Sequence, residues 1–283
     1  MEKQASNVLS TLIIQDFTAL GQMSMTSALT VSQSMNILTA SLPVQMLSTQ
    51  TEGFGQPHRE IMADWMEQVW HHWDTIDIKP FTSTLIGYLG TNELAQLVNM
   101  EIRQHRNPNL IVDPAMADQG RLYPSLTKSY VEEMRRLMSG AQIALPNVTE
   151  LGLLSENDLE MTPSDDKLRQ ALKRCQSFAP DCQIIATGVK KGSAIGCAWL
   201  RGNEIVWAGK NIIKGHFFGT GDLFSATFNV LKLRFPKLDV DQLVSEAMAV
   251  VYAAIQETAA LPAAQWKLGL QLKDAISLLM TFE

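Results

Sequence analysis

The sequence has little cysteine and no long apolar run. Its three cysteines, Cys175, Cys182 and Cys197, are an odd number without a C-x-x-C pair. A disulfide framework or a zinc knuckle is therefore not indicated, and a reducing compartment fits better. No stretch approaches the roughly 18 apolar residues that a membrane span needs. The first residues, MEKQASNVLSTLIIQ, lack the apolar core and cleavage site of a signal peptide, so we expect a cytoplasmic protein without membrane contact.

Several signature motifs are missing as well. The chain has no G-x-x-x-x-G-K-[ST] phosphate loop, no early G-x-G-x-x-G and no G-x-S-x-G turn. His71 and His72 are adjacent, but no H-E-x-x-H zinc motif occurs. The net charge is −6 and the densest basic run is the pair Lys190 and Lys191. No nucleic-acid partner is predicted, because such proteins gather Lys and Arg into a patch or stripe.

What is present is ordinary globular material. The 283 residues are 46% hydrophobic and 18% charged, which is enough to build a large core. We find no internal repeat, low-complexity tract or linker. The sequence therefore predicts a single domain over residues 1–283.

Apolar, β-branched runs alternate with helical patterns along the chain. The expected strands are 8–15, 42–48, 83–90, 109–113, 141–147 and 182–188, with a hairpin over 194–210 that turns at Gly202 and Asn203. The expected helices are 25–40, 59–74 and 91–106, followed by a mostly helical chain from Asp222 with breaks near Pro236 and Pro262. This alternation predicts an α/β fold with a central, mostly parallel sheet.

A polar residue or cluster follows each expected strand. These are Asp16, residues 48–51, Tyr88, Asp113, Asn147 with Glu150, and Thr187 with Gly188. Ligands of such folds bind at the carboxyl ends of the strands. We therefore expect these side chains to meet in one site.

The stretch GTGDLFSA, residues 219–226, places two glycines before an aspartate and an apolar run. Gly219 and Gly221 permit close approach of the backbone to a ligand. If a helix begins at or just before Asp222, its free N–H groups favour an anion there. Asp222 would then be the general base for an alcohol that attacks a bound phosphate. A plain turn with an acidic first-turn residue is the alternative.

Two further segments carry carboxylates after strands. VDPAMADQGRLY, residues 112–123, contains Asp113 and Asp118, and LPNVTE, residues 145–150, adds Asn147 and Glu150. Mg²⁺ is usually held by one or two protein carboxylates together with substrate phosphates and water. Ordinary loop composition is the alternative, because Asp, Asn, Pro and Gly populate turns.

Taken in order, IIQD, STQTEGFG, GYLG, VDPAMADQGRLY, LPNVTE and GTGD resemble the pyridoxal/pyridoxamine (vitamin B6) kinases of the ribokinase-like superfamily. The resemblance runs from about residue 8 to residue 255. It implies a three-layer α/β/α fold and ATP-dependent phosphorylation of the 5′-hydroxymethyl group of pyridoxal, pyridoxamine or pyridoxine. It also implies Mg²⁺ and a homodimer, and it leaves a monovalent cation open.

The resemblance also implies residue roles. Asp222 matches the catalytic base, and Gly219, Thr220 and Gly221 match the anion hole around the γ-phosphate. The positions implied for ATP are Asp113, Asp118, Tyr123, Asn147, Glu150, Thr187 and Gly188, of which Asp113, Asp118 and Glu150 would manage Mg²⁺. The positions implied for the acceptor are Asp16, Met23, Leu47, Ser48, Thr51, Tyr88 and Asp222, with a substrate-covering loop near residues 48–57.

The sequence departs from that family at three positions. Asp16 stands where many members have serine, Gln50 where many have histidine, and Ala117 where many have glycine. These departures concern substrate preference more than chemistry. The alternatives are a hydroxymethylpyrimidine kinase of thiamine synthesis, whose motif resembles GTGC rather than GTGD, then a sugar or nucleoside kinase, and a non-catalytic B6- or nucleotide-binding protein.

Overall fold

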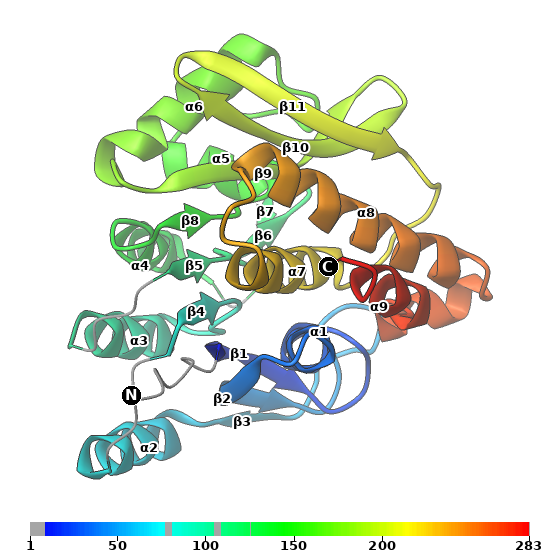
Figure 1. Ribbon diagram of the computed structural model, residues 1–283. Coiled ribbons are helices and arrows are strands. Elements are labelled where there is room, and N and C mark those ends of the chain that lie inside the picture. The colour runs from blue at the N-terminus through cyan, green and yellow to red at the C-terminus, as the bar shows by residue number, and fades with distance from the viewer. Residues whose placement is uncertain (1–8, 77–80, 105–108, 125, 283) are drawn as a thin grey trace, which may run out of the picture.

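A computed structural model describes residues 9–76, 81–104, 109–124 and 126–282. A nine-stranded sheet forms the middle of three layers and carries helices on both of its faces (Figure 1). The predicted α/β/α architecture is therefore confirmed. Val8 of the first expected strand and residues 105–106 of the expected helix 91–106 lie outside the described residues.

The strand order of the sheet is β11-β10-β9-β8-β5-β4-β1-β2-β3. Its strands are β1 (Ser10–Thr18), β2 (Leu38–Leu47), β3 (Arg59–Ile61), β4 (Ser83–Ile86), β5 (Leu110–Val112), β8 (Ile143–Ala144), β9 (Gln183–Lys191), β10 (Ala194–Arg201) and β11 (Glu204–Asn211). The six strands from β9 to β2 in that order run parallel, and β3, β10 and β11 pair antiparallel at the edges. A separate two-stranded ribbon joins β6 (Ala117–Asp118) to β7 (Arg121–Leu122).

Side chains of the parallel strands alternate between two cores, as the period of two in a strand requires. In β1, Leu12 and Ile14 face the first core, whereas Ile13 faces the second. The first core is covered by α2 (Ala63–Thr75), α3 (Asn92–Gln104), α4 (Lys128–Met138), α5 (Val148–Ser155) and α6 (Asp165–Phe178). The second is covered by α1 (Ser24–Ser34), α7 (Thr220–Arg234), α8 (Val240–Ala259) and α9 (Lys273–Leu279).

Two expected helices are partly wrong. The helix expected over 25–40 ends at Ser34, because Asn36 takes a left-handed conformation with φ of 53° and Leu38 begins the pairing of β2 with β1. The helix expected over 59–74 begins at Ala63, because residues 59–61 pair with the end of β2 as a short edge strand. Helices α5 and α6 were not predicted. The hairpin turn at Gly202 and Asn203 is confirmed.

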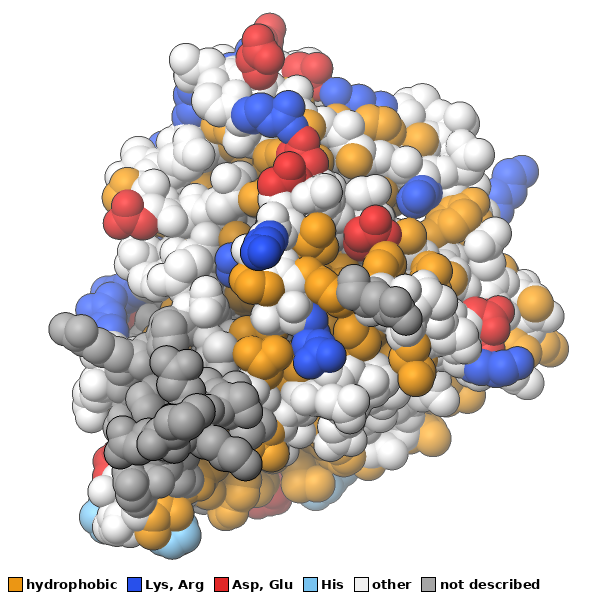
Figure 2. Space-filling view, viewed as in Figure 1, with side chains coloured by type: hydrophobic (Ala, Val, Ile, Leu, Met, Phe, Trp, Pro, Cys, Tyr) orange, Lys and Arg blue, Asp and Glu red, His pale blue; other side chains and the backbone are white. Residues whose placement is uncertain are grey.

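None of the described helices is long and apolar enough to cross a membrane. On the face shown in Figure 2, Lys and Arg side chains are scattered among acidic and apolar ones. That face does not carry the continuous basic surface that is typical of nucleic-acid binding.

Helix α7 is the most deeply packed element of the second core, and Phe228 at its middle has no exposed surface. We expect Phe228→Ala to lower the free energy of unfolding by about 3–5 kcal/mol, because it leaves a cavity between helix and sheet. Urea unfolding followed by far-UV circular dichroism measures the change. The exposed Arg234→Ala, in the last turn of α7, should cost less than about 1 kcal/mol. Equal losses in both variants would contradict this account of the core.

Candidate active site

A cavity of about 850 Å³ opens at the carboxyl ends of the parallel strands. Residues at or just beyond the ends of β1, β2, β4, β5, β8 and β9 line it. The prediction that the polar residues of these strands meet in one place is therefore confirmed. Two of the clusters lie slightly differently than expected, because β1 extends to Thr18 and β9 to Lys191, so Asp16 and Thr187 lie inside strands.

The predicted site residues line this cavity with one exception. Those that do so are Asp16, Met23, Leu47, Thr51, Tyr88, Asp113, Asp118, Tyr123, Asn147, Glu150, Thr187, Gly188, Gly219, Thr220, Gly221 and Asp222. Ser48 does not line it. Its hydroxyl accepts a hydrogen bond from the His58 N–H at 2.9 Å, and Ser48 therefore closes the base of the loop rather than facing a ligand.

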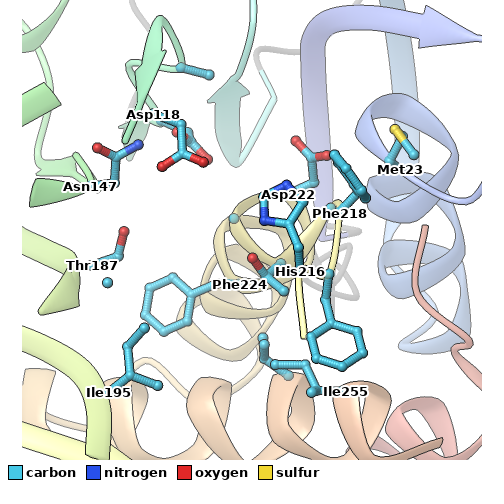
Figure 3. Close-up of a pocket in the computed structure, with 18 of the residues that line it drawn as sticks. Met23, Asp118, Asn147, Thr187, Ile195, His216, Phe218, Asp222, Phe224 and Ile255 are labelled. Carbon is cyan, nitrogen blue, oxygen red and sulfur yellow. The ribbon is translucent and has the colours of Figure 1, made fainter. Parts of the chain in front are cut away.

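The cavity has two sides (Figure 3). Asp222, Met23 and Phe218 lie on one side, and Asp118, Asn147 and Thr187 lie across from them. The first group comes from the starts of α7 and α1, and the second from β6, the start of α5 and β9. Such a separation leaves room for two molecules that meet between the two sides.

Asp222 lies in the first turn of α7, as the GTGD motif predicted. Gly219 is the residue before the helix, with a left-handed φ of 82°, and Thr220 begins it. One carboxylate oxygen of Asp222 accepts a hydrogen bond of 2.8 Å from the Ser24 N–H, at the start of α1. Burial raises the pKa of Asp222, and the Ser24 N–H opposes that rise. A carboxylate of raised pKa is a stronger base at neutral pH.

Asp16 lies in the floor of the cavity and is only 3% exposed. The pairing of β1 with β2 is interrupted between Gln15 and Phe17, which re-aims the side chain between them. One oxygen of Asp16 accepts from the Thr18 hydroxyl at 3.2 Å, and the other has no partner among the described residues. Burial and the charge of Asp222 raise the pKa of Asp16 to about 7.

Asn147 and Glu150 form a capping box at the start of α5. The Asn147 side chain accepts from the Glu150 N–H at 2.9 Å, and one Glu150 oxygen accepts from the Asn147 N–H at 2.8 Å. The other Glu150 oxygen accepts from the Met116 N–H at 3.0 Å. The Asn147 amide donates to the Ala117 carbonyl at 2.7 Å. These bonds attach the ribbon that carries Asp118 to α5.

The carboxylates of Asp113, Asp118 and Glu150 decide how well the site would suit a magnesium ion. Within the described residues, no group of three or more His, Cys, Asp or Glu side chains is arranged to hold a metal ion. Burial and the charge of Asp222 raise the pKa of Asp113, and burial and Asp113 raise that of Glu150. Asp113 and Asp118 are hard oxygen donors beside a cavity with excess negative charge, and this fits Mg²⁺ held mainly by phosphates and water.

Sequence reasoning missed several residues that line the cavity. They are Thr18, Ser24, Gln119, Lys190, Ile195, Lys210, His216, Phe217, Phe218, Phe224, Met248, Tyr252 and Ile255. Residues 216–218 could have been predicted to line the cavity, because they directly precede the GTGD motif in the sequence. Ser24 contributes a backbone N–H, which no sequence pattern announces.

Comparison with known proteins identifies the family. The sequence pattern of the family described as phosphomethylpyrimidine kinase matches residues 14–268. The chain belongs to the phosphomethylpyrimidine kinase family. The matched region includes both the Asp16 strand and the GTGD motif, so the whole cavity belongs to the family fold.

Known proteins that resemble the chain carry two kinds of name. The pyridoxal kinase from Lactobacillus plantarum is 31% identical, with a TM-score of 0.90 and 97% of each chain covered. A Caenorhabditis elegans protein named "Putative pyridoxal kinase" is 27% identical over 200 residues, which are 68% of this chain but only 59% of the worm protein. A Bacteroides thetaiotaomicron structure, named as a phosphomethylpyrimidine kinase and containing pyridoxal, shares the fold at 22% identity, with a TM-score of 0.85 and 96% of each chain covered.

The raised pKa of Asp16 predicts a pH-dependent stability. The folded acid holds its proton up to about pH 7, whereas the unfolded acid loses it near pH 4. The contribution of Asp16 to the free energy of unfolding therefore falls as the pH rises through this interval. We expect the free energy of unfolding of Asp16→Asn, relative to that of wild type, to rise by roughly 1–3 kcal/mol between pH 5 and pH 8.

Thermal and urea unfolding of the ligand-free protein at both pH values measure this difference. Asp181→Asn, at an exposed position, is the matched control. A stability difference for Asp16→Asn that is the same at pH 5 and pH 8 would contradict the assignment.

Proposed function

We propose that the protein transfers the γ-phosphoryl group of ATP to the 5′-hydroxymethyl group of a vitamin B6 vitamer. The observation that carries this proposal is the position of the Asp222 carboxylate. It lies in the first turn of α7, lines the cavity and accepts a hydrogen bond from the Ser24 N–H. The likeness to the Lactobacillus plantarum pyridoxal kinase over nearly the full length of both chains supports a pyridine acceptor.

The chemistry follows from the position of Asp222. Its carboxylate accepts the proton of the acceptor hydroxyl while that oxygen attacks the γ-phosphorus and ADP leaves. The free N–H groups at the start of α7, which follow Gly219, are suited to stabilise the charge on the transferred group. Because burial raises the pKa of Asp222, the carboxylate takes that proton more readily than a solvated aspartate does.

The side of the cavity that contains Asn147, Thr187 and Gly188 is the proposed position of ATP. Asp113 and Asp118 would hold Mg²⁺ there, directly or through water, and the ion would offset phosphate charge. Glu150 acts by fixing the β6–β7 ribbon, because both of its oxygens accept backbone N–H groups.

The opposite side provides the proposed acceptor pocket. Met23 and Leu47 are apolar walls, and Tyr88 offers a ring whose edge-to-face partner is Tyr123 at 5.7 Å. The unpartnered oxygen of Asp16 would accept a hydrogen bond from a protonated pyridine nitrogen or from the ring hydroxyl. The loop over 48–57 would exclude water from the bound substrates.

A second candidate is phosphorylation of hydroxymethylpyrimidine, which the name of the matched family favours. We rank it second because the full-length relative at 31% identity is a pyridoxal kinase. A single domain over residues 1–283, a homodimer and a cytoplasmic location are further proposals that accompany the kinase function.

We expect Asp222→Asn to lower kcat by about 10²–10⁴, because the amide cannot take the hydroxyl proton. The affinity for Mg·ATP should change little. Vitamer-dependent ADP release and nucleotide titration measure the two quantities. Asp181→Asn, at an exposed position that does not line the cavity, serves as control. A kcat within about tenfold of wild type would remove Asp222 from the role of base.

The acceptor is tested by parallel assays with pyridoxal, pyridoxamine, pyridoxine and hydroxymethylpyrimidine under saturating Mg·ATP. We expect the highest kcat/KM for one of the three pyridine vitamers. A higher value for hydroxymethylpyrimidine would reverse the ranking of the two candidates. Binding of a vitamer without ADP release would instead indicate a non-catalytic carrier.

A further inference from the structure

The loop over 48–57 is held in place by a segment more than 200 residues away in the sequence. The Gln50 side-chain amide donates to the Lys267 carbonyl at 2.9 Å, and Gln50 is only 8% exposed. Lys267 belongs to a short 3₁₀ helix, η1 (Ala263–Leu268), which follows α8. We refer to residues 266–269 as the C-terminal clasp.

Lys267 makes two further contacts with the loop through its side chain. Its ammonium group donates to the Gly53 carbonyl at 3.1 Å and lies 4.3 Å from the centre of the Phe54 ring. Both are contacts that a cation makes well, one with a carbonyl dipole and one with a ring face. Lys267 therefore holds the part of the loop that adjoins the cavity-lining residues Thr51 and Glu52.

The clasp also contacts the segment that leads into the GTGD motif. The centre of the Trp266 ring lies 4.7 Å from the centre of the Phe217 ring. The Trp266 indole N–H donates to the Leu261 carbonyl at 3.0 Å, which fixes the orientation of the Trp266 ring. Within the same segment, His216 lies 3.6 Å from Glu52 of the loop. The loop over 48–57 and the segment over 216–218 therefore contact each other, and both also contact the clasp.

A third cavity wall is attached to the clasp by its backbone. The Gln22 N–H donates to the Leu268 carbonyl at 2.7 Å, and Gln22 pairs with Gly269 as an isolated bridge. Gln22 precedes Met23, which lines the cavity and adjoins Gly219. The clasp therefore contacts three of the segments that surround the proposed acceptor pocket.

The tip of the loop is costly to fix in one conformation. Gly53 and Gly55 both have φ of 77°, and residues 51–53 are exposed. Glycines in an exposed loop lose much conformational entropy when they are fixed. Contacts from outside the loop must offset that cost, and the Lys267 contacts are suited to do so.

We propose that the C-terminal clasp holds the loop over 48–57 closed above the acceptor, with Lys267 as a positioning residue for phosphoryl transfer. This inference rests on the proposed kinase function. Lys267 acts through the loop, since it is not among the residues that line the cavity. Its loss should affect acceptor binding and water exclusion rather than the nucleotide side.

The test compares Lys267→Ala, Lys267→Arg and Lys273→Ala with wild type. Lys273 is an exposed lysine at the start of α9 and is the matched control. We expect Lys267→Ala to raise the KM for the vitamer about tenfold and to increase ADP release without vitamer phosphorylation. The KM for ATP should stay within about twofold. Lys267→Arg should recover most of the loss, because guanidinium also donates and lies over rings.

Hydrogen exchange of residues 50–56 provides a readout that does not depend on the reaction. We expect exchange there to be faster in Lys267→Ala and unchanged in Lys273→Ala. Unchanged exchange in Lys267→Ala, or a KM for the vitamer equal to that of Lys273→Ala, would overturn the proposal. If wild type phosphorylates no acceptor, the proposed function fails, and the exchange measurement still decides whether the clasp orders the loop.

Discussion

The hydrogen bond from the Ser24 N–H to the Asp222 carboxylate is the contact on which the site depends. It joins the first turns of α1 and α7, which are 198 residues apart in sequence, and it fixes the direction of the proposed base. A Cβ at Gly219 would lie 3.1 Å from the Met23 Cβ, so the two helix starts are as close as side chains allow. The N–H groups in the first turn of a helix favour an anionic group beside them.

Negative charge gathers opposite these helix starts. Burial raises the pKa of Asp16, Asp113 and Glu150, and neighbouring carboxylates raise them further. A cavity of this kind costs stability while no ligand is bound, and a cation or hydrogen-bond donor relieves that cost when it enters. The site therefore trades stability for the ability to bind, a trade that active sites commonly make.

The sequence predicts the parts of the site that depend on local patterns. Asp113 and Asn147 follow short apolar strands, and the parallel topology alone brings such positions together. The start of α7 is also predicted by a local pattern, because Gly219 directly precedes an apolar helical run. Lys267 and His216 could not be found in this way, because their contacts depend on how distant segments pack, and neither stands in a periodic pattern. Ser48 was wrongly predicted to face the acceptor although it lies in the same loop as Thr51. Its hydroxyl accepts the His58 N–H, a contact that the local sequence does not predict.

Two of the three departures from the B6 kinases, Asp16 and Gln50, line the cavity on its proposed acceptor side. Asp16 brings a carboxylate with an unpartnered oxygen to the cavity floor, and Gln50 brings an amide that donates to the Lys267 carbonyl. A glutamine amide donates at every pH, whereas an imidazole changes its charge near neutrality. The contact between loop and clasp therefore keeps its donor while the nearby carboxylates change protonation. Under the proposed function, acceptor choice can vary through Asp16 while the Gln50 contact between loop and clasp is kept.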